Sequence, residues 1–235
     1  MNLNPSILIQ ARIGSSRLRS KILRKVQGKS ILETGFLRLK KSRFTNKIIY
    51  LIPDSEENQV LKREIDSFGG EVFLGSENDL ISRYLNCSKK YNLNEIIRIT
   101  SDCPLVDPKE VDKLISIYQK VNNNNLYVSN FTPPEYSSYC NGSDIEIFSL
   151  EMLEKVNEVF KSSRDREHVT FPFWDGRLNC DHLKIGWGNK INLKKIRLTI
   201  DYEEDIKVIE FLSSKINLIN ASLEEICETY KKHNL

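Results

Sequence analysis

Long apolar runs are missing from this sequence of 235 residues. The longest clusters, such as residues 48–52, have the length of a strand and fall far short of the ~20 residues that a membrane helix needs. The first five residues lack the charged and then apolar layout of a secretory signal. We therefore expect neither a membrane span nor a membrane partner.

Cysteine motifs are also missing. The five cysteines are scattered along the chain, and no Cys-x-x-Cys spacing occurs among them. This pattern argues against a secreted disulfide framework and against a zinc ribbon. The expected location is the reducing environment of the cytoplasm.

Acidic residues are nearly absent from one stretch near the N-terminus. Between Arg12 and Lys47 there are twelve Lys or Arg residues and one acid, Glu33. The rest of the chain carries 23 bases and 31 acids. A basic stretch on an acidic body indicates a site for an anion, although the bases at residues 40–43 fit a solvated helix face equally well.

Strand-like and helix-like patterns alternate along the chain. Strands are predicted over residues 7–9, 47–52, 71–74, 95–100, 126–129, 143–148, 183–185 and 197–200. Helices are predicted over residues 31–39, 56–68, 80–91, 111–121 and 150–160, around 166–173, and from Glu203 and Ser222. Asp107 and Pro108 are typical of a helix start. This order predicts one α/β domain over residues 1–235, with a mainly parallel sheet and helices on both faces.

The first predicted strand is followed by a loop suited to phosphate. In open α/β sheets, ligands bind outside the carboxyl ends of the strands. Gly14 permits a sharp turn there, and the small residues after it leave backbone amides open to phosphate oxygens. Four cations lie within ten residues, namely Arg12, Arg17, Arg19 and Lys21. They would repel one another without an anion among them, so the loop is predicted to bind a polyphosphate.

Two common nucleotide motifs do not fit this loop. A P-loop would end as Gly28-Lys29-Ser30 does, but Leu23 stands where its first glycine belongs. The sequence also lacks Gly-x-Gly-x-x-Gly, so a Rossmann dinucleotide site is not indicated.

Residues 10–21 read Gln-Ala-Arg-Ile-Gly-Ser-Ser-Arg-Leu-Arg-Ser-Lys. This run resembles the N-terminal signature of sugar cytidylyltransferases, above all the spore-coat polysaccharide cytidylyltransferase-like branch, beside the acylneuraminate and 3-deoxy-manno-octulosonate enzymes. Arg19 and Ser20 replace the proline and glycine that are usual there. If that glycine position takes a positive φ, Ser20 costs about 1 kcal/mol. Further matches follow in order at residues 73–79, 83–84, 98–105, 142–146, 166–170 and 197–205.

The resemblance implies a fold, a reaction and a set of site residues. The fold is the Rossmann-like nucleotide-diphospho-sugar transferase fold, and the reaction moves CMP from CTP to a small anionic sugar or phosphate-ester acceptor. A nonulosonic acid leads the acceptor candidates; Mg²⁺ is the implied cofactor, and a homodimer is implied. Nucleotide binding is expected at Gln10, Ala11, Arg12, Ile13, Gly14, Ser15, Ser16, Arg17, Lys21, Gly75, Ser76 and Ser101. Catalytic roles fall to Arg12, Lys21, Asp102 and Asp201, the last two as metal ligands. Acceptor binding is expected at Gly142, Asp144, Glu146, Arg166 and His168.

Local structure offers other roles for several of these residues. Asp102 and Asp201 each follow a predicted strand, where they would share one Mg²⁺ with phosphate oxygens. Asp201 equally fits the cap of the next helix, and Asp102 fits the turn before Pro104. His168 fits a buried structural histidine nearly as well as an acceptor ligand.

Two other functions are also compatible with the sequence. Asp144 and Glu146 alternate along a predicted strand, so they would share a face and fit the metal pair of a glycosyltransferase. A non-catalytic RNA-binding module would use the basic stretch, but it needs interleaved aromatic residues. Only Phe36 and Phe44 occur within that stretch.

Overall fold

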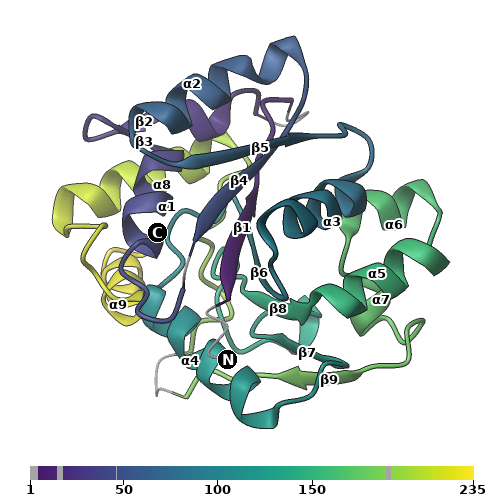
Figure 1. Cartoon of the computed structure of the whole chain (residues 1–235). Coiled ribbons are helices and arrows are strands. Elements are labelled where there is room, and N and C mark those ends of the chain that lie inside the picture. Colours follow the sequence, from purple (N-terminus) through teal and green to yellow (C-terminus); the bar gives the residue numbers. More distant parts are fainter. Residues whose placement is uncertain (1–4, 15–17, 46, 189–191) are drawn as a thin grey trace.

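A seven-stranded sheet runs through the middle of the molecule (Figure 1). The computed structural model describes residues 5–14, 18–45, 47–188 and 192–235. The strands lie in the order β5-β4-β1-β6-β8-β7-β9. Their bounds are β1 Ser6–Gln10, β4 Ile48–Pro53, β5 Glu71–Gly75, β6 Glu95–Thr100, β7 Leu126–Ser129, β8 Glu146–Ser149 and β9 Asp181–Lys184.

The sheet is mainly parallel, as predicted. β1 pairs in parallel with β4 and β6, β4 with β5, and β7 with β9. β8 runs antiparallel to both β6 and β7. Ile7 and Leu8 of β1 point to opposite faces and are both fully buried. This is the pattern of a central parallel strand that is covered on both sides.

Helices cover both faces of the sheet, which confirms that prediction too (Figure 1). One face packs against α1 Ile31–Leu39, α2 Gln59–Ser67 and α4 Pro108–Val121. The other face packs against α3 Leu80–Tyr91, α5 Leu150–Val159 and α7 Phe171–Trp174. α6 Ser163–His168 contacts α3. α8 Glu203–Lys215 and α9 Leu223–Lys232 form a third apolar cluster beside α1.

Asp107 caps α4, as its sequence context predicted. Its Oδ1 accepts from the Lys109 amide at 2.8 Å, and its Oδ2 accepts from the Leu223 amide at 2.7 Å. The same carboxylate therefore begins α4 and holds the start of α9 against it.

Two predicted strands are wrong in part or in full. Residues 143–148 were expected as a strand, but β8 begins only at Glu146. The Asn130 side chain donates to Ser143 O and accepts from the Ile145 amide, so it replaces the backbone ladder there. Residues 197–200 form no strand, and Arg197 makes an isolated bridge with Asn141.

The sequence did not predict the short hairpin of β2 Lys25–Val26 and β3 Lys29–Ser30. Its turn residues, Gln27 and Gly28, have φ of 51° and 80°. Two consecutive positive φ values are typical of tight hairpin turns. Among the described residues, no helix is both long and apolar enough to cross a membrane.

Candidate active site

A cavity of about 600 Å³ lies at the carboxyl ends of β1 and β6. This is the edge at which open α/β sheets bind ligands. Several predicted site residues line it, namely Gln10, Ala11, Arg12, Lys21, Ser101, Asp102 and His168. The remaining lining residues are Ile22, Glu77, Asn78, Leu80, Arg83, Thr100, Ser163 and Glu167.

Two carboxylates converge on one ammonium group beside this cavity. Lys21 Nζ donates to Asp201 Oδ1 at 2.9 Å and to Asp102 Oδ2 at 3.2 Å. The Lys21 and Asp201 side chains are 10% and 12% exposed, whereas that of Asp102 is 29% exposed. The structure thus brings together both predicted metal ligands and the predicted catalytic lysine.

A backbone contact places the two carboxylates side by side. The Ile200 amide donates to Asp102 O at 2.9 Å, and Asp201 follows directly in the chain. The sequence placed Asp201 at the end of a strand, but residues 197–200 instead run as a loop against the turn after β6. The predicted proximity holds for a different structural reason.

Arg197 fixes the outer side of Asp201. Its Nη2 donates to Asp201 Oδ2 at 2.9 Å, and its Nε donates to Asp205 Oδ1 at 2.9 Å. Asp205 Oδ2 also accepts from the Asp201 and Tyr202 amides at 2.7 and 2.9 Å. Burial alone would raise the pKa of Asp205, but these hydrogen bonds lower it. Tyr202 is the N-cap of α8, so Asp201 is not the cap that its position also fitted.

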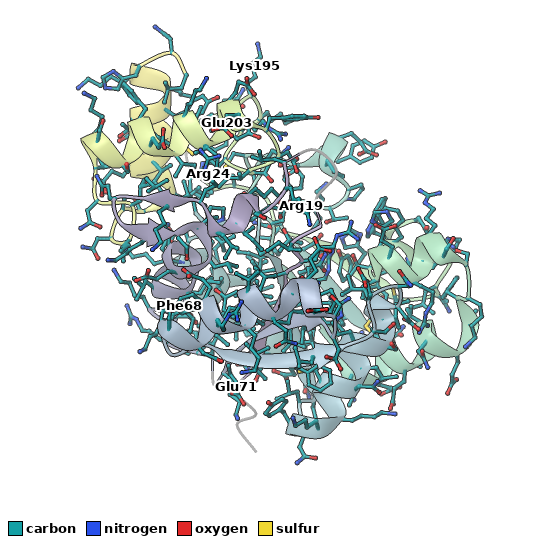
Figure 2. All side chains as sticks on the ribbon, turned by 90° about the horizontal axis from the view of Figure 1, so that it is seen from above. Arg19, Arg24, Phe68, Glu71, Lys195 and Glu203 are labelled. Atoms are coloured by element: carbon teal, nitrogen blue, oxygen red, sulfur yellow. The ribbon has the colours of Figure 1, made fainter. Side chains whose placement is uncertain are left out.

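A second ion pair ties the lysine segment to the Asp201 segment. Arg24 donates to both oxygens of Glu203, at 3.0 and 2.8 Å, and the two side chains lie close together (Figure 2). Arg24 follows Lys21 by three residues, and Glu203 follows Asp201 by two. The pair therefore joins these two segments at the surface.

The loop after β1 is held at both ends. The Ile13 amide donates to Asn58 Oδ1 at 3.0 Å, and the Ser20 amide donates to Ile13 O at 3.2 Å. Because its amide is already bonded, Ile13 offers its NH less freely to a phosphate than expected. Ser20 has φ 56° and ψ 18°, which is the left-handed conformation that a glycine would adopt at lower cost. Ser15, Ser16 and Arg17 lie outside the described residues.

Arg12 contacts α6 across the cavity. Its Nη2 donates to Glu167 Oε1 at 3.3 Å, and both side chains are more than half exposed. Sequence reasoning did not assign Glu167 to the site, although it lies between the predicted Arg166 and His168. Its contact with Arg12 joins residues 155 positions apart in the chain, which local patterns do not reveal.

Gln10 belongs to a buried polar chain that begins at β8. Glu146 is 3% exposed and accepts from Arg98 Nη1 and the Tyr127 hydroxyl. Arg98 Nε then donates to Gln10 Oε1 at 3.0 Å, and the Tyr84 hydroxyl donates to the same oxygen at 3.2 Å. Since Gln10 Oε1 accepts twice from the protein, its NH₂ group is the side that remains for a ligand. Glu146 thus orients Gln10 indirectly, through Arg98.

Asp144 lies close to Asp102, with Cys103 between them. Cys103 Sγ donates to Asp144 Oδ2 at 3.4 Å and lies 3.8 Å from Asp102 Oδ1. Burial raises the pKa of Asp144 to about 7, although the Cys103 hydrogen bond opposes this change. The position fits an acceptor contact beside Asp102.

His168 and Arg166 have different surroundings, although both belong to α6. The His168 ring lines the cavity and stacks on Phe171 at 4.3 Å. Burial lowers the pKa of His168, although the nearby negative charge of Glu167 acts to raise it. Arg166 instead donates to Asp79 and to Asn157 Oδ1, so it joins α6 to other helices and does not line the cavity.

Three predicted residues act through the backbone. A Cβ on Gly142, which has φ +94°, would lie 2.3 Å from Thr199 N, so glycine permits the close contact with residues 198–199. Gly75 and Ser76 do not line the cavity. Arg83 does, and its Nε donates to Ser76 O at 2.9 Å.

The pair of Asp102 and Asp201 fits Mg²⁺. Among the described residues, no group of three or more His, Cys, Asp or Glu side chains forms a metal cage. Mg²⁺ does not require one, because it commonly takes one or two carboxylates and completes its shell with water and substrate phosphates. These two carboxylates already share one cationic group, Lys21 Nζ.

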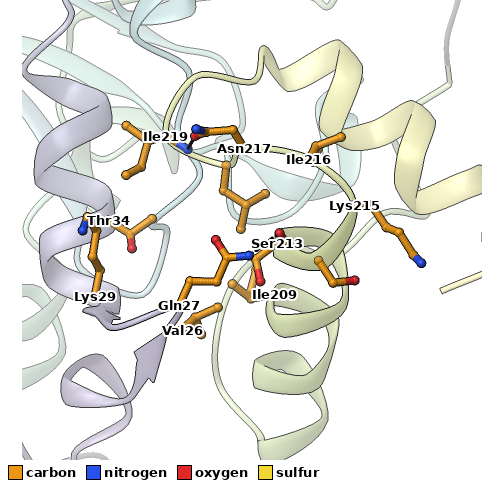
Figure 3. Close-up of a pocket in the computed structure, with 12 residues that line it drawn as sticks. Val26, Gln27, Lys29, Thr34, Ile209, Ser213, Lys215, Ile216, Asn217 and Ile219 are labelled. Carbon is orange, nitrogen blue, oxygen red and sulfur yellow. Dashed lines mark hydrogen bonds between the residues drawn. The ribbon is translucent and has the colours of Figure 1, made fainter.

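A second cavity of about 470 Å³ lies between the β2–β3 hairpin and the end of α8 (Figure 3). Gln27 Nε2 donates to Ser213 O within it. None of the described residues that line it is an Asp or Glu. It lacks the acids that the first cavity has, so the first cavity is the candidate site.

Comparisons with known proteins show the family of the chain. Residues 6–218 match the sequence model of the cytidylyltransferase family. A solved structure of a cytidylyltransferase from Leptospira borgpetersenii superposes with a TM-score of 0.91 at 32% identity, over 99% of this chain and 95% of that one. The spore coat polysaccharide biosynthesis protein SpsF of Bacillus subtilis is 27% identical over 88% of this chain and 85% of its own length. The 8-amino-3,8-dideoxy-manno-octulosonate cytidylyltransferase of a Shewanella species is 30% identical over 50% of this chain and 49% of its own.

Proposed function

Because the chain belongs to the cytidylyltransferase family and is a nucleotidyltransferase, we propose that it transfers CMP from CTP to a sugar acid and releases pyrophosphate. The observation that carries this proposal is the convergence of Asp102 and Asp201 on Lys21, at the sheet edge where nucleotides bind. A basic loop, two acids and a cavity in one place are the parts that a metal-bound triphosphate requires.

The triphosphate lies against the loop that follows β1. Arg12 and Lys21 bind its phosphate oxygens and offset the charge that builds on the leaving pyrophosphate. Nucleotide contacts are assigned to Gln10, Ala11, Ile13, Gly14 and Ser101, and from the sequence also to Ser15, Ser16 and Arg17. Gly75 and Ser76 belong to the segment that the Arg83 side chain binds. Placement and charge neutralisation account for most of the catalysis, since the protein forms no covalent intermediate.

Asp102 and Asp201 would hold Mg²⁺ in this proposal. An ion held there would supply a Lewis acid that polarises the α-phosphate and lowers the pKa of the attacking hydroxyl. Arg197 keeps Asp201 oriented from the opposite side, through its 2.9 Å contact with Oδ2.

The acceptor is a small anionic sugar, with a nonulosonic acid as the leading candidate. The name of the Shewanella relative, which specifies an eight-carbon sugar acid, supports this class. His168 at the cavity and Asp144 beside Asp102 contact the acceptor, whereas Arg166 positions α6 and Glu146 positions Arg98. As part of the same proposal, residues 1–235 form one domain, and the protein is a cytoplasmic homodimer that acts on small molecules, neither on nucleic acid nor at membranes.

A metal-dependent glycosyltransferase that uses Asp144 and Glu146 is less well supported. Both oxygens of Glu146 are hydrogen-bonded, one to Arg98 and the other to Tyr127, and the residue is 3% exposed. A metal ion shared with Asp144 would have to displace a buried ion pair.

Nucleotide specificity provides the test. Thermal unfolding is measured with CTP, UTP, ATP or GTP in the presence of Mg²⁺, and pyrophosphate release is then measured with candidate sugar acids. We expect CTP to raise the melting temperature most and pyrophosphate to form only with CTP and an acceptor. A shift with ATP or GTP and none with CTP would rule out cytidylyl transfer.

A further inference from the structure

Lys21 Nζ occupies the point on which Asp102 and Asp201 converge. Each carboxylate contributes one oxygen to it, at 3.2 and 2.9 Å. An ion shared by the two acids would need these same oxygens or this same space. Two cations held there together would repel each other strongly, because the group is largely removed from water.

The pair also needs a cation when no ligand is bound. Asp201 and Lys21 are nearly buried, and removing one partner from a buried ion pair leaves an uncompensated charge at high cost. Arg197 neutralises part of the charge of Asp201, but it also pairs with Asp205, and its contacts with described residues do not include Asp102. Within the described part of the chain, Lys21 is therefore the only cation that forms an ion pair with Asp102.

We infer that Lys21 competes with the divalent cation for the Asp102–Asp201 pair. The Lys21 ammonium occupies the pair until a bound triphosphate attracts it away. The inference rests on the proposed function. The flexible four-carbon stem of lysine lets its ammonium move from carboxylate to phosphate. The two acids then become available at the moment when the nucleotide supplies the remaining metal ligands. Nucleotide and ion consequently bind as a coupled pair, and the free protein binds the ion weakly.

The test measures Mn²⁺ binding without nucleotide, by the electron paramagnetic resonance signal of the free ion. Lys21→Met should bind Mn²⁺ roughly tenfold or more tightly than the wild type, because a neighbouring positive charge has been removed. Lys25→Met removes an exposed lysine four residues away and should bind as the wild type does. Adding Asp102→Asn to Lys21→Met should abolish the gain, which places the ion at the acid pair.

The possible outcomes separate this inference from the proposed function. Equal Mn²⁺ affinity of the wild type and Lys21→Met without nucleotide would overturn the competition. If Asp102→Asn still abolished that Mn²⁺ binding, the proposed metal site would stand although the competition had failed. If neither protein binds Mn²⁺ even with CTP present, both proposals fail. If Lys21→Met does not fold, the wild type is compared with Asp102→Asn instead. Tight Mn²⁺ binding by the wild type without nucleotide, abolished in Asp102→Asn, would contradict the competition. Equally weak Mn²⁺ binding by the wild type and Asp102→Asn would support the competition.

Discussion

The guanidinium of Arg12 and the carboxylate of Glu167 form an ion pair at 3.3 Å that joins the loop after β1 to α6. A triphosphate bound at this loop would compete with Glu167 for the same guanidinium. Both side chains are more than half exposed, so the pair contributes about 1 kcal/mol at most.

Replacing Glu167 should therefore improve nucleotide binding. We expect Glu167→Gln to lower the KM for CTP by up to about fivefold, the equivalent of about 1 kcal/mol, because Arg12 no longer has to leave a carboxylate. Glu154→Gln is the matched control, since it breaks a surface ion pair with Lys89 at 3.0 Å and neither residue lines the cavity. An unchanged or raised KM in Glu167→Gln would show that the pair does not oppose nucleotide binding.

Loss of either cation assigned to the triphosphate should slow turnover. Arg12→Ala and Lys21→Ala should each reduce kcat by about 100-fold or more, because a charge partner of the transition state is removed. Steady-state pyrophosphate release provides the measurement, with Lys25→Ala as the control for a nearby exposed lysine. Rates like those of the wild type in either variant would reject that residue's assignment.

Asp102 provides a sharper test of the metal site. Asp102→Asn keeps the size of the side chain but removes the charge, so Mg²⁺-dependent pyrophosphate release should fall to background. Asp54→Asn, an exposed aspartate just after β4, should retain activity. Full activity of Asp102→Asn across Mg²⁺ concentrations would dismiss Asp102 as a ligand.

Ser20 stores a small backbone strain. Its φ of 56° favours glycine, so Ser20→Gly should raise the free energy of unfolding by up to about 1 kcal/mol. Ser67→Gly, at the last residue of the helix α2, should instead lower it by roughly 0.5–1 kcal/mol. Urea denaturation measures both, and destabilisation by Ser20→Gly would contradict the strain.

Asp144 should make stability depend on pH. Its pKa rises from 3.8 to about 7 in the folded protein through burial, so the folded state binds more protons than the unfolded state between these values. This stabilisation is complete below pH 4 and is lost as pH rises through 7. Asp144→Asn should therefore gain stability relative to the wild type as pH increases from 4.5 to 8. A difference between the two proteins that stays constant over this range in urea titrations would contradict the buried carboxyl.

Local patterns were sufficient for most of the fold. α1 and α3 have the predicted bounds because their apolar residues repeat at helical spacing and their first turns are capped by Ser30 and Asp79. Prediction failed where a side chain replaced the backbone ladder, as Asn130 does before β8. The β2–β3 hairpin was missed because two-residue strands carry almost no periodic signal.

The candidate site was predictable only to the level of motifs. Loop chemistry and resemblance placed Arg12, Lys21 and Asp102 at one sheet edge, where the structure has them. The partners of those motifs come from distant segments. Glu146, which was expected at the acceptor, is buried and forms an ion pair with Arg98. The two residues are 48 positions apart and meet because of the antiparallel register of β6 and β8.

We propose that Lys21, Asp102 and Asp201 form the site of a metal-bound nucleotide. Crystals grown with a non-hydrolysable CTP analogue and Mn²⁺ test it most directly, through the anomalous signal of the ion. We predict a Mn²⁺ peak in contact with both carboxylates and the analogue's phosphates, with Lys21 Nζ moved onto a phosphate oxygen. A triphosphate bound elsewhere, or an ion that contacts neither Asp102 nor Asp201, would contradict the account.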